Sequence, residues 1–212
     1  MRITVFGAAG GVGARVVTEA LGRGHRVVAV SRNPDRLRDL PVEVELRAGD
    51  AADPEQVVDL GADSDLVISA TRPVPGREAE LAQVAAALLK GLGGTETRLL
   101  VVGGAGSLTV PGTGRTLAEQ PDFPADLHPI AEGCNRQLAV FTGYAGAVDW
   151  TYLSPAALLE PGVRTGAYRL GADELIADDE GNSAISMEDL AVALLDEAER
   201  PKHHRTRFTV GY

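Results

Sequence analysis

The sequence predicts an α/β fold in which a mostly parallel β-sheet is doubly wound, with helices on both faces. Short runs of β-branched and other apolar residues recur along the chain, beginning at 3–6 and 26–30. Such continuous apolar runs are typical of strands that are buried on both faces of a parallel sheet. Stretches with helical apolar spacing alternate with them, and this alternation favours right-handed crossovers between parallel strands.

The first strand, 3–6, leads directly into three glycines. Gly7, Gly10 and Gly13 are spaced G-x-x-G-x-x-G, and a stretch with helical apolar periodicity follows. Strand, tight glycine turn and helix N-terminus form the phosphate-binding unit of a Rossmann-type fold, because the free N–H groups and the helix dipole favour a pyrophosphate. The alternative is a structural turn that binds no ligand.

The second strand, 26–30, ends in Ser31 and Arg32 rather than in an acidic residue. An acidic side chain at this position bonds the ribose 2′-hydroxyl of NAD(H), whereas an arginine suits a 2′-phosphate. Arg36 stands one turn along the short helix expected at 34–37. The pattern therefore favours NADP(H) over NAD(H), with two solvated arginines as the alternative.

The next elements are a third strand at 42–46, a helix at 54–60 and a fourth strand at 65–69. Asp50 follows the third strand, where it either contacts adenine or caps a turn. Ala70 and Thr71 leave the fourth strand at its carboxyl end, which is the ligand side of such a sheet.

A helix at 77–90 and a fifth strand at 98–102 lead into the glycine-rich segment 103–114. That segment is either a flexible connector or an active-site loop, and Ser107 within it either orients a ligand or stabilises the loop. A surface crossing over 116–129 brings His128 either near the site or simply to the surface. A helix is expected at 130–142.

The C-terminal part is expected to begin with a sixth strand at 149–153, after which Pro155 lies at the ligand side. A small hairpin is expected around Gly171, a solvated turn at 178–182, a capping box from Ser186 to Asp189, and a last strand at 205–210. The adjacent histidines 203 and 204 indicate solvated side chains.

Composition limits the function classes. The 212 residues carry a net charge of −10 and a single cysteine. An acidic surface argues against nucleic acid and anionic membranes as partners, and the chain shows no signal peptide or spanning segment. We expect a cytoplasmic monomer or homodimer, with 1–212 as one NAD(P)-binding Rossmann domain and substrate-side elements at about 103–130 and 154–186.

Several segments together resemble the atypical short-chain dehydrogenases. More particularly, they are similar to the NAD(P)H-binding NADH-flavin reductase group, which is related to biliverdin-IXβ/flavin reductase. The segments that carry the resemblance are Val-Phe-Gly-Ala-Ala-Gly-Gly-Val-Gly at 5–13, Ser-Arg-Asn-Pro at 31–34, Gly-Asp at 49–50, Val-Gly-Gly-Ala-Gly-Ser-Leu at 102–108, Pro-Asp-Phe-Pro at 121–124, Asp-Trp-Thr-Tyr-Leu-Ser-Pro-Ala at 149–156, and the stretches 185–191 and 207–212.

The resemblance implies a role for matching positions. Asp50 would sit by adenine, Ser107 would lie near the nicotinamide, and Pro155 would flank its carboxamide. The remaining cofactor residues that it implies are Ala9, Gly10, Gly11, Val12 and Gly13 at the pyrophosphate, Arg32 at the 2′-phosphate, and Ala70 and Thr71 along the ribose.

One departure bears on the reaction. Carbonyl-reducing members use a Tyr-x-x-x-Lys pair, in which lysine lowers the tyrosine pKa. The only lysines here are Lys90 and Lys202, and alanines stand four residues before each. The sequence therefore favours hydride transfer from NADPH to a planar acceptor, such as FMN, FAD or a quinone, over alcohol–ketone chemistry. The alternative is a non-catalytic NADP(H) sensor that acts through a protein partner.

Overall fold

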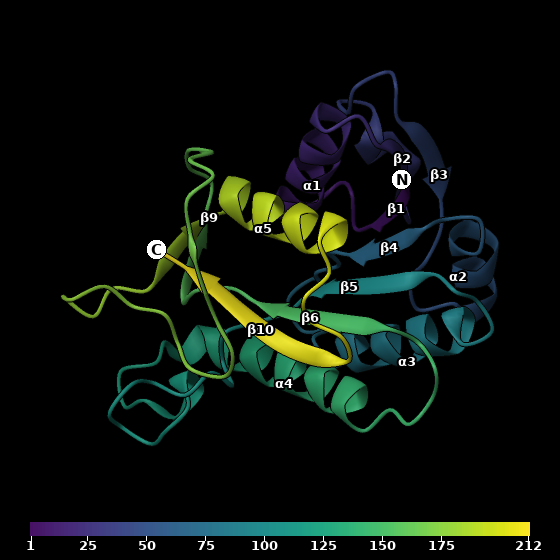
Figure 1. The fold of residues 1–212 in the computed structure, drawn as a ribbon. Coiled ribbons are helices and arrows are strands. Elements are labelled where there is room, and N and C mark those ends of the chain that lie inside the picture. The colour runs from purple at the N-terminus through teal and green to yellow at the C-terminus, as the bar shows by residue number, and fades with distance from the viewer.

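An eight-stranded sheet runs through the centre of the molecule, with helices on both faces (Figure 1). The computed structural model describes residues 1–212. The strand order is β3-β2-β1-β4-β5-β6-β10-β8, and only β8 is antiparallel to its neighbour. The predicted doubly wound, mostly parallel sheet is confirmed.

Most of the predicted strands and helices are present in the expected order, and two short strands that were not predicted, at 158–160 and 184–186, pair with each other. The strands are β1 (Arg2–Phe6), β2 (Arg26–Ser31), β3 (Glu45–Ala48), β4 (Leu66–Ser69), β5 (Arg98–Val102), β6 (Trp150–Ser154), β7 (Leu158–Glu160), β8 (Arg169–Gly171), β9 (Ala184–Ser186) and β10 (Thr206–Gly211). The helices are α1 (Gly11–Gly22), α2 (Pro54–Gly61), α3 (Glu80–Leu92), α4 (His128–Thr142) and α5 (Met187–Glu199), with 3-10 turns η1 (Pro34–Leu37), η2 (Leu117–Glu119) and η3 (Ala125–Leu127).

Two apolar cores lie on the two faces of the sheet. Alternation along β1 explains this arrangement, because Ile3 and Val5 point to the core under α1 and α5, whereas Phe6 joins the core under α2, α3 and α4. Figure 1 shows α1 and α5 together on one face and α3 and α4 on the other. None of the helices combines the length and the hydropathy that crossing a lipid bilayer requires.

Local sequence sets where several helices begin. Asp53 accepts hydrogen bonds from the backbone N–H groups of Glu55 and Gln56, and Pro54 occupies the first turn of α2. The expected cap at Ser186 is confirmed, since its hydroxyl accepts a hydrogen bond from the backbone N–H of Asp189 at 3.0 Å. These caps satisfy amide groups that have no partner inside the helix.

Two glycines of the turn between β1 and α1 leave no room for a Cβ. Gly7 has φ +81°, and a Cβ there would lie 2.5 Å from the carbonyl oxygen of Ala70. A Cβ at Gly13 would lie 2.2 Å from the carbonyl oxygen of Gly7. The two glycines therefore let β1, α1 and the end of β4 meet backbone to backbone.

Two expectations about the strands are wrong. The segment 42–44 forms a turn, in which the Val44 N–H bonds the Pro41 carbonyl, so β3 begins only at Glu45. No hairpin forms around Gly171, because β8 pairs with the free edge of β10 and Glu174 bridges to Thr109. A long-range partner therefore replaces the local pairing.

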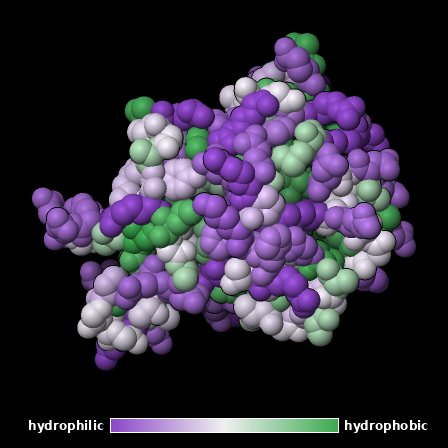
Figure 2. Space-filling view, viewed as in Figure 1, coloured by the Kyte–Doolittle hydropathy of each residue, from purple (hydrophilic) through white to green (hydrophobic).

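The segments 103–130 and 154–186 both lie at the carboxyl ends of the strands, on the left of Figure 1. They touch through the bridge between Thr109 and Glu174. Figure 2 shows a mostly hydrophilic face, with an apolar patch on the same side of the molecule. Both segments can therefore border a site at that edge of the sheet.

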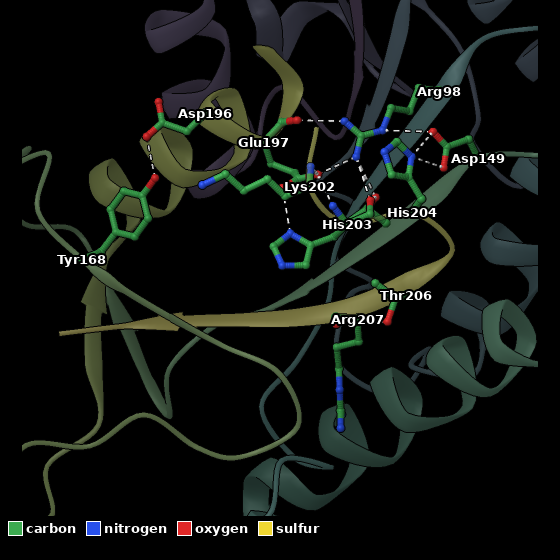
Figure 3. Close-up of polar contacts among 11 residues, drawn as sticks. Arg98, Asp149, Tyr168, Asp196, Glu197, Lys202, His203, His204, Thr206 and Arg207 are labelled. Carbon is green, nitrogen blue, oxygen red and sulfur yellow. Dashed lines mark hydrogen bonds and ion pairs between the residues drawn. The ribbon is translucent and has the colours of Figure 1, made fainter. Parts of the chain in front are cut away.

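A buried ionic network joins α5 to the start of β5, at the end of the sheet that lies opposite the carboxyl ends of the strands (Figure 3). The carboxylate of Glu197, 4% exposed, accepts a hydrogen bond from Arg98 at 2.6 Å and contacts the His203 ring at 2.8 Å. The His203 ring stacks on Phe208. The expectation that His203 is solvated is therefore wrong, because its ring is mostly covered by these partners.

Burial raises the pKa of the Glu197 carboxyl, but hydrogen bonds from the backbone of His203, from Arg98 and from the His203 ring outweigh it. The net pKa is lowered. A lowered folded-state pKa stabilises the fold above the unfolded glutamate value of about 4.3. This contribution is lost as the pH falls through the folded-state pKa.

We expect Glu197→Gln to lower the free energy of unfolding by about 3 kcal/mol at pH 7, because it removes the buried counter-charge of the Arg98 guanidinium and leaves only the more exposed Asp149, 3.4 Å away. Urea unfolding at several pH values measures this loss. The difference from the unsubstituted protein should shrink as the pH falls below the unfolded glutamate pKa of about 4.3 and through the lower folded-state pKa of Glu197. A pH-independent loss would contradict the assignment.

We expect Gly13→Ala to lower the free energy of unfolding by about 2 kcal/mol, because the added methyl overlaps the Gly7 carbonyl. Gly22→Ala is the matched control on the same helix, since a Cβ there meets nothing within 4 Å. The control should be neutral or stabilise by up to about 1 kcal/mol. Equal effects of the two substitutions would show that the close approach is unimportant.

Candidate cofactor and active site

A cleft of about 860 Å³ runs along the carboxyl ends of the parallel strands. Its walls come from the β1–α1 turn, the ends of β2, β4, β5 and β6, and the facing sides of α3 and α4. In the sheet, β1 lies between β2 on one side and β4 on the other, so the order of the strands reverses at β1. The cleft lies at this topological switch point. Open α/β sheets bind their ligands at this position.

The glycine turn forms one wall of the cleft. Gly10 precedes the first residue of α1, Gly11, so the unpaired N–H groups of the first turn lie at the cleft. The predicted cofactor residues that line the cleft here are Gly7, Ala9, Gly10, Gly11 and Val12. Gly13 lies behind them against the Gly7 carbonyl and shapes the turn without lining the cleft. This geometry suits a pyrophosphate.

The end of β2 supplies two arginines to the same cleft. Arg32 lines it and lies 3.8 Å from Glu80 of α3, with about half of its side chain exposed. Glu80 also pairs with Arg77. Arg36 lines the cleft from the 3-10 turn after β2 and has no acidic partner. This end can therefore offer guanidinium groups to a phosphate.

Asp50 makes a turn, as one of its two predicted roles requires, and it also lines the cleft. The residue lines the cleft, and its carboxylate accepts a hydrogen bond from the backbone N–H of Ala52 at 3.0 Å. Its own N–H donates to the side chain of Gln56 at 2.9 Å. The turn is thus fixed by local hydrogen bonds while the aspartate remains at the cleft wall.

The cleft is basic within an acidic protein. Four arginines line it, at positions 32, 36, 72 and 77, against three carboxylates, at positions 50, 80 and 160. The whole chain carries a net charge of −10. A locally positive, concave surface attracts anionic ligands over the background of a negative molecule.

The other end of the cleft is formed by small and apolar residues. Ala70, Thr71 and Pro155 line it at the ends of β4 and β6, as predicted for residues that flank a cofactor. The glycine-rich segment contributes Gly103, Gly104, Ala105 and Gly106. A Cβ at position 103 would lie 1.9 Å from the ring of Tyr152, so the loop lies directly on that ring.

The two predicted catalytic side chains lie outside the cleft wall. Ser107 accepts a hydrogen bond from Arg207 at 2.8 Å, and Asp173 holds that arginine in turn. His128 is exposed at the start of α4, edge-on to Phe123 with 4.9 Å between ring centroids. The structure brings neither one together with the other predicted site residues.

Sequence reasoning did not assign Arg72, Cys134 or Gln137 to the site, yet all three line the cleft. Burial raises the pKa of the Cys134 thiol to about 11, and nearby Arg72 opposes this rise. The thiol is therefore protonated at neutral pH and is a poor nucleophile. Arg72 could have been found, because it directly follows Ala70 and Thr71 at the end of β4.

The side chains of the cleft limit its chemistry. No tyrosine, histidine or lysine is among the residues that line it. Tyr152 lies beneath the glycine-rich segment, 1% exposed, and burial raises its pKa well above the usual value. The arrangement can bind an extended anionic ligand and hold a flat ring, but it offers no neutral-pH proton donor of the tyrosine–lysine kind.

Comparison with known proteins agrees with this geometry. The model of the NAD(P)H-binding family matches residues 7–201. YwnB of Bacillus subtilis (strain 168), itself uncharacterized, is 38% identical, with 99% of this chain and 98% of YwnB covered.

Two solved structures are similar over the whole chain. A candidate epimerase from Bacteroides thetaiotaomicron is 38% identical with a TM-score of 0.89, covering 100% of this chain and 96% of that one. A candidate NADH-flavin reductase from Streptococcus pneumoniae TIGR4 is 31% identical with a TM-score of 0.88, covering 100% and 99%. The chain therefore belongs to the NAD(P)H-binding family, as its resemblance to the atypical short-chain dehydrogenases predicted.

Proposed function

We propose that this protein is an NADPH-dependent reductase that transfers hydride to a planar acceptor, such as free flavin or a quinone. The observation that carries the proposal is the cleft itself. It combines a helix N-terminus, two arginines after β2 and an apolar far end without a tuned proton donor. The similarity to the Streptococcus pneumoniae candidate NADH-flavin reductase supports the same reaction class.

Each part of the cleft has a proposed task. The first turn of α1 binds the pyrophosphate, Arg32 and Arg36 bind the 2′-phosphate, and Asp50 borders adenine. Ala70 and Thr71 border the ribose, and Pro155 flanks the carboxamide. NADPH supplies the hydride when bound, and the role of the chain is to orient two flat rings and exclude water.

A planar, electron-poor acceptor suits this cleft because its reduction does not require a strongly tuned acid. Solvent can protonate a reduced flavin or quinone, whereas carbonyl reduction needs a donor at the reacting oxygen.

The proposed roles of Ser107 and His128 require their segments to turn toward the cleft when ligands bind. Neither side chain lines the cleft in this structure.

The similarity to a candidate epimerase suggests another reaction, but the cleft fits it less well. Epimerisation by proton transfer needs an acid and a base on either side of the reacting carbon. Glu80 is paired with Arg32 and Arg77, and Asp50 is used in a turn. Two of the three carboxylates in the cleft wall are thus engaged at the arginine-rich end, and the third, Glu160, is exposed at the end of β7.

The second candidate function is an NADP(H) sensor without turnover. It is favoured by the same lack of tyrosine, histidine and lysine in the cleft wall. A sensor must distinguish NADP⁺ from NADPH by affinity, or its partner must do so. Measuring both dissociation constants alongside turnover separates the two candidates.

We expect the purified protein to oxidise NADPH when FMN, FAD or menadione is added, followed by the loss of nicotinamide absorbance. Each assay should include NADPH without acceptor and acceptor without protein as controls. Tight binding of NADPH with no turnover across the acceptor panel would reject the reductase and favour the sensor.

We expect Arg32→Gln to weaken NADPH binding by about tenfold or more, because it removes charge-assisted hydrogen bonds to the 2′-phosphate. NADH binding should change by less than about twofold, since the interaction is absent there. Arg38→Gln is the matched control, because Arg38 is exposed, pairs with Asp35 and lies outside the cleft. Equal losses for NADPH and NADH would place Arg32 away from the 2′-phosphate.

A further inference from the structure

One polar side chain at the cleft has an unused hydrogen-bonding group. Gln137 of α4 lines the cleft and is only 1% exposed. Its side-chain nitrogen, Nε2, is buried and has no hydrogen-bond partner in the protein. A buried amide without a partner costs about 1–3 kcal/mol, so its presence beside a ligand cleft indicates that a ligand supplies the partner.

The other half of the same amide is held from behind. The hydroxyl of Tyr152 lies 3.2 Å from Oε1 of Gln137 and 3.1 Å from the carbonyl oxygen of Cys134. The Tyr152 ring is fixed in turn beneath Gly103, where no Cβ fits. The single hydroxyl hydrogen is shared between these two acceptors, so the amide oxygen is contacted from behind while the N–H groups have no partner in the protein.

The surroundings of Gln137 strengthen any hydrogen bond that it makes. Leu81 and Val84 of α3 and Ala131 of α4 line the same cleft and are apolar and nearly buried. A hydrogen bond is stronger in such a low-dielectric setting. A ligand that cannot accept this hydrogen bond leaves the buried amide unpaired and therefore binds more weakly. Arg72, close to Cys134, adds positive charge at this end.

Position separates Gln137 from the proposed cofactor residues. The pyrophosphate turn belongs to α1, on one face of the sheet, whereas Gln137 belongs to α4, on the other face. Pro155, which is proposed to flank the carboxamide, follows β6. Gln137 thus lines the cleft from the α3–α4 side, where the second substrate would enter between these helices and the cofactor.

We propose that the Gln137 carboxamide donates a hydrogen bond to a carbonyl oxygen of the hydride acceptor. The acceptor is then a ring that carries a carbonyl group, as isoalloxazines and quinones do, rather than any planar electron acceptor. This inference rests on the proposed reductase function and assigns Gln137 as a residue that determines acceptor specificity. Tyr152 acts as its positioning residue.

The test is Gln137→Met, which keeps the length and volume of the side chain and removes the amide. We expect KM for FMN and for menadione to rise about tenfold. The rate with methylene blue, a planar acceptor without a carbonyl group, should stay unchanged. The dissociation constant of NADP⁺ should also stay unchanged, and thermal stability should be equal or higher, because a buried unpaired amide is gone.

Leu138→Met is the matched control, since Leu138 neighbours Gln137 on α4 but packs in the core outside the cleft. It should leave all four quantities unchanged. Tyr152→Phe is a second variant that frees the amide without removing it, and it should raise KM for FMN about threefold over that of the unsubstituted protein. It decides the question if Gln137→Met fails to fold.

Two results would overturn the inference while leaving the reductase proposal intact. One is an unchanged KM for FMN and menadione in Gln137→Met, and the other is an equal loss with methylene blue. Weakened NADP⁺ binding by the same factor would reassign Gln137 to the cofactor. If the unsubstituted protein reduces no acceptor, the reductase proposal fails, and quenching of FMN fluorescence by the NADP⁺-bound variants then tests Gln137 alone.

Discussion

The close approach of three backbone segments at the end of β1 is the constraint on which the site depends. Gly7 places its Cα against the Ala70 carbonyl, and Gly13 places α1 against the Gly7 carbonyl. These contacts bring the first turn of α1 and the ends of β1 and β4 to one point at the switch in strand order. The wall that we propose to bind the pyrophosphate is therefore made of backbone, and its geometry is set by packing rather than by flexible side chains.

The rest of the cleft follows from what the sheet presents on either side of that point. Toward β2 and β3 lie the guanidinium groups and carboxylates of Arg32, Arg36, Asp50 and Glu80. Toward β5 and β6 lie glycines, apolar side chains and the unpaired amide nitrogen of Gln137. The cleft thus has a charged end suited to a nucleotide and an apolar end suited to a ring.

Much of this could be predicted from the sequence because the signals are local. The glycine spacing at 7–13, the arginine after β2 and the alternation of strands with helices each involve a few neighbouring residues. The cap at Ser186 is of the same kind, since residue and partner are three positions apart. Local geometry alone dictates these features.

Other features depend on partners far apart in the chain and left no local signal. The pairing of β8 with β10, rather than with 174–177, depends on an open sheet edge. The His203–Glu197 pair depends on α5 ending beside the start of β10. Ser107 and His128 carry suitable functional groups, but the serine hydroxyl accepts a hydrogen bond from Arg207 and the histidine is exposed to solvent. No local pattern in the sequence assigns Gln137 to the site, because Tyr152, which contacts its amide oxygen, lies fifteen residues further along the chain.

In the reaction that we propose, the cleft holds a nicotinamide with one face toward an acceptor, and hydride passes directly between them. The most direct measurement is single-turnover oxidation of NADPH deuterated stereospecifically at C4, with FMN or menadione as acceptor. We expect a slower transfer with only one of the two deuterated isomers, because a fixed ring presents one hydrogen. Equal rates with both isomers, or no turnover with either, would contradict it.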